Sequence, residues 1–245
     1  MIYAILIEAD QYNSLGGSCI RDLYNMANAL IAIHISEIYV LYNREINIKN
    51  FPTCYREKLV SFQKQIQNII QKLKECDILL FYISGHGYQM KDQDGDEEDG
   101  YDEYIQLSCG RVTDDELHTL LFTNLPVNTR VIGICDTCHS GSMFDLDYSY
   151  RLPRWEKTSK KSTSIEAISI GACLDCQSAQ CEVGNIIGFG GALSIHLIEN
   201  LLLYKLFSPH PEDWIYVYEK LRSIMISLNQ MPSLQISKKL YEKIQ

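Results

Sequence analysis

The chain has 245 residues, 46% of them hydrophobic, so it can bury one sizeable core, and α/β domains of this length commonly fold as one unit. The net charge of −9 gives no support to nucleic-acid binding. The first apolar run, residues 2–7, is too short for a membrane span or a signal-peptide core. We expect one domain over residues 1–245 that binds neither nucleic acid nor membrane.

Apolar runs and helical patterns alternate along the chain. Strands are predicted at residues 2–7, 38–41, 78–83, 131–134 and 165–170. Residues 57–74 carry apolar side chains at helical spacing, and a second such stripe over residues 214–228 follows Pro211, a residue that helix starts tolerate. This alternation predicts βαβ units around a parallel sheet. Residues 234–237 alternate in polarity and predict a last strand at the edge of the sheet.

The negative charge is concentrated in residues 92–103, which hold eight acidic and no basic side chains. The window indicates a cation site or a solvated loop, and for most of its acids we expect the loop. Asp92, Asp94, Asp96 and Glu103 have EF-hand spacing, but Glu97 stands where that loop requires glycine, which excludes an EF-hand.

Two further features concern processing and location. Residues 149–163 include five basic residues and one acidic residue, which predicts an exposed linker.

Nine cysteines, an odd number, without a signal peptide indicate a reducing compartment, so we expect the cytoplasm, without excluding the nucleus.

Reactive side chains stand at the polar ends of two predicted strands. One strand ends in Ser84-Gly85-His86-Gly87 and the other in Asp136-Thr137-Cys138-His139-Ser140-Gly141, with His86 located 52 residues before Cys138. Two parallel strands can bring a cysteine nucleophile and a histidine base together. Because side chains alternate along a strand, Ser84 shares the direction of His86, and Asp136 that of Cys138. The glycines let a substrate carbonyl approach backbone amides, which suits acyl transfer.

These motifs resemble the signatures of the metacaspase branch of the caspase-like cysteine peptidases. The resemblance extends to residues 15–22, 94–103 and 171–179, in family order. It implies a caspase-like three-layer α/β/α sandwich with about six mostly parallel strands. It also divides the chain into a large catalytic segment (1–148), the basic linker (149–163) and a small segment (164–245). Such linkers are cut during maturation, so residues 151–161 are a candidate self-cleavage site.

The resemblance also implies roles for individual residues. Cys138 would be the nucleophile and His86 its base, and the amides of Gly87 and Cys138 would hold the oxyanion. Asp22, Ser84, Asp136 and Cys19 would form the primary specificity pocket. Two carboxylates in one pocket demand a cation, so we expect polypeptide substrates with Arg or Lys before the scissile bond.

The same resemblance implies calcium as the activator, bound by Asp102, Asp114, Asp115 and Asp145, with no organic cofactor. Hard oxygen ligands suit calcium better than zinc. We further expect a monomer. The sequence begins at the first predicted strand, so we expect no regulation by a prodomain. Arg21 and Ser18 depart from the family pattern, which leaves the pocket rim and the role of Cys19 open.

Other functions are also compatible with these residues. With Cys138 and His86 intact, the chain could still be a catalytically idle, calcium-responsive scaffold that binds peptides. The pairs Cys135/Cys138 and Cys173/Cys176 match a zinc pattern, and residues 135–139 also match a haem c attachment site. Zinc bound by both pairs would consume the proposed nucleophile, and haem attachment normally follows export, which the N-terminal residues do not indicate. His139 is expected to point away from the thiol and to be structural.

Overall fold

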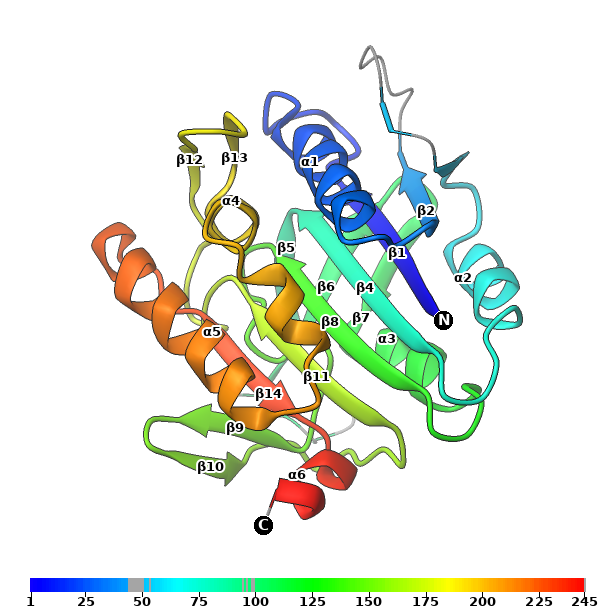
Figure 1. Ribbon diagram of the computed structural model, residues 1–245, viewed down its shortest axis with the longest axis vertical. Coiled ribbons are helices and arrows are strands. Elements are labelled where there is room, and N and C mark those ends of the chain that lie inside the picture. Colours follow the sequence, from blue (N-terminus) through cyan, green and yellow to red (C-terminus); the bar gives the residue numbers. More distant parts are fainter. Residues whose placement is uncertain (44–50, 53, 94, 96, 98–99, 245) are drawn as a thin grey trace.

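The computed structural model describes residues 1–43, 51–52, 54–93, 95, 97 and 100–244. Within these residues, nine strands form one sheet in the order β10-β9-β14-β11-β8-β4-β1-β2-β3 (Figure 1). The five strands predicted from apolar runs are β1 (Ile2–Ala9), β2 (Glu37–Tyr42), β4 (Ile78–Gly85), β8 (Arg130–Asp136) and β11 (Glu166–Gly171). They pair in parallel, as predicted, and form the centre of the sheet.

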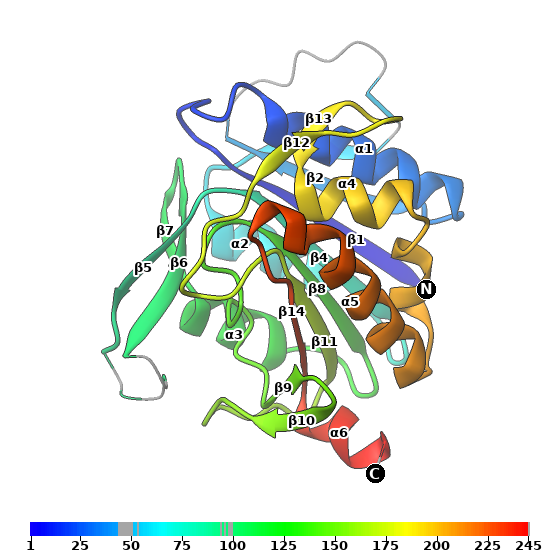
Figure 2. The same ribbon diagram turned by 90° about the vertical axis from the view of Figure 1, so that its left-hand side faces the viewer.

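Helices cover both faces of this sheet. One face carries α1 (Ser18–Ala32), α4 (Ala192–Glu199) and α5 (Pro211–Met225), and the other carries α2 (Phe62–Ile70) and α3 (Asp114–Phe122) (Figures 1 and 2). Successive side chains of β1 enter different cores, because Leu6 packs under α1 and α4 whereas Ile5 and Ile7 pack under α2 and α3. The expected three-layer α/β/α sandwich is confirmed.

The last strand, β14 (Ser233–Ile236), forms as predicted but not at the edge of the sheet. It pairs antiparallel with β11 on one side and with β9 (Tyr148–Arg151) on the other, and β10 (Arg154–Lys157) follows β9. The predicted linker therefore contains a β-hairpin. Its aromatic residues explain the difference, because Tyr150 is buried against Trp155 and Tyr218 at ring-centroid distances of 5.0 and 5.5 Å.

The pattern predicted as one helix over residues 57–74 is shorter in the structure. Its first residues belong to β3 (Tyr55–Lys58), which pairs with β2, and only α2 is helical. The apolar stripe nevertheless packs as predicted, since Phe62, Ile66 and Leu73 are all buried. The late helix is confirmed, with Pro211 in its first turn.

Two small sheets, two 3₁₀ helices, η1 (Leu203–Phe207) and η2 (Ile226–Leu228), and a terminal helix complete the described elements. β5 (Gly87–Lys91), β6 (Tyr101–Leu107) and β7 (Gly110–Thr113) form a sheet that stands apart from the central one in Figure 2. β12 (Cys181–Val183) and β13 (Phe189–Gly191) form a hairpin beside α1 and α4. α6 (Lys238–Ile244) follows β14. None of the helices in the described ranges has the length and apolar character needed to cross a membrane.

Candidate active site

The site is assembled by the register of β1, β4 and β8. Ser84 at the end of β4 stands opposite Asp136 at the end of β8, and Glu8 of β1 stands opposite Ser84. Because parallel strands end at the same edge of a sheet, the residues that follow β4 and β8 leave it together. His86 and Cys138 accordingly line one small cavity of about 110 Å³. The strand pairing expected from the two motifs is confirmed.

The Cys138 thiol has a backbone partner that the sequence did not identify. The N–H of Ala179 donates to Cys138 Sγ at 3.3 Å. Hydrogen-bond donation to sulfur favours the thiolate, the nucleophilic form of cysteine. Residues 171–179 resemble a family motif, but nothing in their sequence indicates which amide faces the thiol.

His86 is held by residues from the loop after β1. Its Nε2 lies 2.6 Å from Ser14 Oγ and 3.9 Å from Asp10 Oδ1. No orienting carboxylate for His86 could be named from the sequence. The neighbouring His139 bonds through Nδ1 to the backbone carbonyl of Asp175, in keeping with the structural role expected for it.

Gly87, expected to contribute to the oxyanion hole, begins β5 directly beside the nucleophile. A Cβ at this position would overlap the carbonyl oxygen of Cys138, so only glycine permits this approach. The main chains of Gly87 and Cys138 are therefore adjacent. Their role as oxyanion donors stays a prediction.

The residues expected in the specificity pocket come together in the same cavity. Asp22, Ser84, Asp136 and Cys19 all line it. Ser84 Oγ donates to Asp22 at 2.8 Å, and the Gly191 N–H donates to both Asp22 oxygens at 3.1 and 3.2 Å. Asp136 accepts from the backbone N–H and the hydroxyl of Ser194 in the first turn of α4, where the helix dipole favours a negative group.

Both pocket carboxylates carry an electrostatic cost when no cation is present. Asp22 and Asp136 are 1% and 5% exposed. Burial raises the pKa of Asp136 to about 6. Burial, and then the nearby charge of Asp136, raises the pKa of Asp22 well above its usual value. Burial also raises the pKa of the Cys19 thiol, so Cys19 contributes a neutral wall. A bound cation would relieve this cost.

Acidic side chains form a second group, whose members do not line the cavity of Cys138. Oxygen atoms of Glu97, Asp114 and Asp145 lie within 4.8 Å of one another, and the described part of the chain holds no other such group of three possible ligands. Lys161 Nζ contacts Asp115 and lies 3.2 Å from Asp145. The ammonium group of Lys161 therefore already lies beside these carboxylates. The donor set, carboxylate oxygens only, fits calcium.

The four residues expected to bind calcium are only partly grouped by the structure. Asp114 and Asp145 belong to the group, and Asp102, buried on β6, does not. Asp115 is not a member either, but Lys161 forms ion pairs with both Asp115 and Asp145. Glu97 is an additional member that the sequence indicated only as part of an acidic loop.

Other acids of the window differ from the expected solvated loop. Asp102 and Glu103 are buried on β6, and burial together with the charge of Asp175 raises the pKa of Glu103 to about 9. Four further acids of the window, Asp94, Asp96, Glu98 and Asp99, lie outside the described residues.

This acidic group is connected to the nucleophile loop by hydrogen bonds. Asp114 accepts the backbone N–H of Glu103 at 2.6 Å, and the Glu103 carboxyl bonds to the hydroxyl of Ser142, four residues after Cys138. The Ser142 N–H donates to Asp175 at 3.0 Å. Hydrogen bonds thus connect the acidic group with the loop that carries the nucleophile.

The zinc and haem alternatives receive no support. In the residues the structure describes, the cysteines form no group of three possible ligands. Cys135 is fully buried within β8 and bonds to Thr137, where a haem vinyl group cannot reach its sulfur. Cys173 Sγ is bonded to backbone carbonyls.

Comparisons with known proteins agree with this geometry. The family model described as metacaspase, peptidase C14 domain matches residues 3–147. Metacaspase-1B of Neurospora crassa is 34% identical over 157 residues, covering 60% of this chain and 35% of that protein. Metacaspase-1 of Meyerozyma guilliermondii is 31% identical over 189 residues, covering 74% and 43%. The matched segment is thus less than half the length of these relatives.

A solved structure, protein GSU0716 from Geobacter sulfurreducens, shares the fold, with a TM-score of 0.60 and 22% identity over 96% of this chain and 93% of that one. The family match covers more than half of the chain, including both strand ends that carry His86 and Cys138. The chain therefore belongs to the metacaspase family.

Proposed function

We propose that this protein is a cysteine endopeptidase that cleaves after Arg or Lys. The observation that carries the proposal is one cavity lined by Cys138, His86 and the two buried carboxylates Asp22 and Asp136. A thiol and an imidazole can perform acyl transfer, and two buried carboxyl groups in one enclosed space favour a positive side chain, whose charge stabilises their ionised forms. Membership of a peptidase family supports the same reaction class.

In the proposed reaction, Cys138 attacks the carbonyl carbon of the scissile bond. His86 takes the thiol proton and then gives it to the leaving amine. The amides of Gly87 and Cys138 stabilise the oxyanion. Water then hydrolyses the acyl-enzyme, with His86 acting again as the base. The Ala179 N–H donates a hydrogen bond to Cys138 Sγ and so holds the sulfur in place for the attack.

We also propose that calcium binds at Glu97, Asp114 and Asp145, with Asp102 and Asp115 as further candidates. When bound, it would supply positive charge to buried carboxylates. The hydrogen bonds through Glu103 and Ser142 support an effect on the nucleophile loop.

Self-processing within residues 151–161 belongs to the same proposal. The tip of the β9–β10 hairpin, residues 151–154, is exposed and carries Arg151 and Arg154, both suitable for the acidic pocket. We further propose a monomer, since the last strand, β14, is paired with β11 and β9 and offers no free edge of its own to another chain. A cytoplasmic location is proposed from nine cysteines that are all free thiols.

Peptide cleavage tests the proposed activity. With calcium, the protein should release a fluorophore from a peptide ending in Arg and not from one ending in Asp, and Cys138→Ala should lower kcat/KM at least about 1,000-fold. The exposed Cys109 provides a matched control, since Cys109→Ala should retain full activity. Intact mass measured on the same samples reports self-cleavage. A folded protein that binds calcium but cleaves neither peptide would favour the scaffold function instead.

The raised pKa of Asp136 predicts how pH controls recognition. Below about pH 6 this carboxyl is neutral and above it is charged, so Cys138→Ala should bind an Arg-ending peptide about tenfold more weakly at pH 5 than at pH 7. A peptide ending in citrulline, an uncharged analogue of Arg, is the control and should show no such change. Calorimetric titration measures both. Equal affinity at the two pH values, or the same trend with citrulline, would contradict the assignment.

Calcium binding can be tested without measuring activity. Asp145→Asn removes one charge from the acidic group and should weaken calcium binding, measured by calorimetry, at least about tenfold. Asp213→Asn removes a charge from α5, outside the group, and should leave calcium affinity unchanged. Absence of calcium binding by the unaltered protein, or equal affinity of both variants, would refute this site.

A further inference from the structure

The loop after β1 forms a rigid support around one buried carboxylate. Asp10 is 1% exposed and accepts the backbone N–H of Ser14 at 2.9 Å and that of Leu15 at 3.1 Å. It also accepts the hydroxyl of Ser14 at 3.1 Å. These three bonds fix both the carboxylate and the Ser14 side chain, so Ser14 Oγ meets His86 with its orientation already set.

The hydrogen-bond chemistry then determines which nitrogen of His86 carries the proton. A carboxylate only accepts hydrogen bonds, so the single hydroxyl proton of Ser14 is directed to Asp10. The Ser14 oxygen, 2.6 Å from Nε2, is left to accept, and Nε2 must therefore be the protonated nitrogen of neutral His86. The lone pair then lies on Nδ1, which becomes the nitrogen available as a base.

The backbone at the end of β1 also holds His86. The N–H of His86 donates to the carbonyl of Ala9 at 2.9 Å. Gly85 has φ +153° and packs so closely on Ala9 that a Cβ would overlap its backbone. The end of β1 thus fixes the main chain of His86 through Ala9 and its ring through Asp10 and Ser14.

We propose that Ser14 and Asp10 are positioning residues that hold His86 in the tautomer with Nδ1 free to accept the Cys138 proton, and that stabilise the imidazolium formed afterwards. The proposal rests on the proposed peptidase function and deepens it. The stabilisation follows from the 3.9 Å separation of Asp10 Oδ1 and Nε2. Other titratable groups also face this region, namely Tyr88, Cys138, Cys19, Cys181, Asp22 and Asp136.

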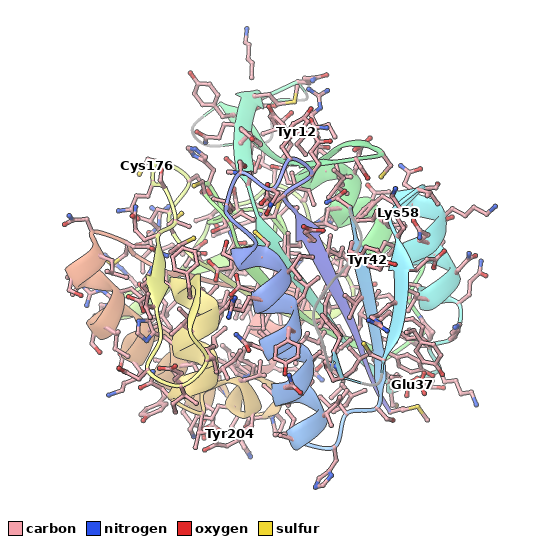
Figure 3. The ribbon with its side chains drawn as sticks, turned by 90° about the horizontal axis from the view of Figure 1, so that it is seen from above. Tyr12, Glu37, Tyr42, Lys58, Cys176 and Tyr204 are labelled. Carbon is pink, nitrogen blue, oxygen red and sulfur yellow. The ribbon has the colours of Figure 1, made fainter. Side chains whose placement is uncertain are left out.

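Substitutions at Ser14 test whether Ser14 positions His86. Ser14→Ala removes the acceptor for Nε2–H and should lower kcat for an Arg-ending peptide about 10- to 100-fold with KM unchanged. Ser14→Thr keeps the hydroxyl and should restore most of the rate. Tyr12→Ala is the matched control and should leave kcat unchanged. Tyr12, labelled in Figure 3, belongs to the same loop and is 82% exposed.

The pH profile separates positioning from a merely structural role. Asp10→Asn removes the negative charge beside the imidazolium. The acid limb of the pH profile of kcat/KM should therefore move to lower pH. The acid limb of the pH profile for alkylation of Cys138 by iodoacetamide should move in the same direction. Alkylation needs no peptide turnover, so it tests the positioning of His86 even if the unaltered protein cleaves no peptide. If Asp10→Asn does not fold, Ser14→Ala alone is followed by the same alkylation profile.

Two outcomes would overturn the proposal. One is an alkylation profile and kcat of Ser14→Ala equal to those of the unaltered protein. The other is an equal loss in Ser14→Ala and Ser14→Thr, which would assign the effect to packing. Failure of the peptidase function itself would appear differently, as an absence of cleavage with the pH profile of alkylation still altered by Ser14→Ala.

Discussion

The parallel register of β1, β4 and β8 is the constraint on which the site depends. Three strand ends meet because Glu8, Ser84 and Asp136 stand side by side in the sheet. From this row the chain continues to Asp10, His86 and Cys138, each two residues further on. A shift of one strand by a single residue would turn these side chains to the opposite face. The apolar side chains that are buried on the two faces of the sheet therefore stabilise this register.

Electrostatics at the site combine opposing demands. The pocket brings the buried carboxyl groups of Asp22 and Asp136 close to the Cys138 thiol. Neutral donors compensate locally, since Ser84, Gly191 and Ser194 bond to the carboxylates and Ala179 bonds to the sulfur. Under the proposed function, a substrate Arg or Lys completes this balance, so binding and activation of the nucleophile would favour each other.

The sequence predicted what depends on local pattern. Apolar runs predicted the central strands, and the two strand-end motifs predicted that His86 and Cys138 would be neighbours. Asp10 and Ser14 could not be predicted, because their loop has no periodicity and Ser14 meets His86 across 72 residues of chain. The β9–β10 hairpin was missed because its basic residues obscured Tyr150 and Trp155, whose burial becomes evident only with Tyr218 in place.

Covalent labelling tests the central claim most directly. The protein would react with matched chloromethyl ketones of Arg-ending and Asp-ending peptides, and peptide mapping by mass spectrometry would locate the label among the nine cysteines. The account predicts one equivalent of the Arg reagent on Cys138 and negligible reaction with the Asp reagent. Equal labelling by both reagents, or labelling mainly at exposed cysteines such as Cys76 and Cys109, would contradict it.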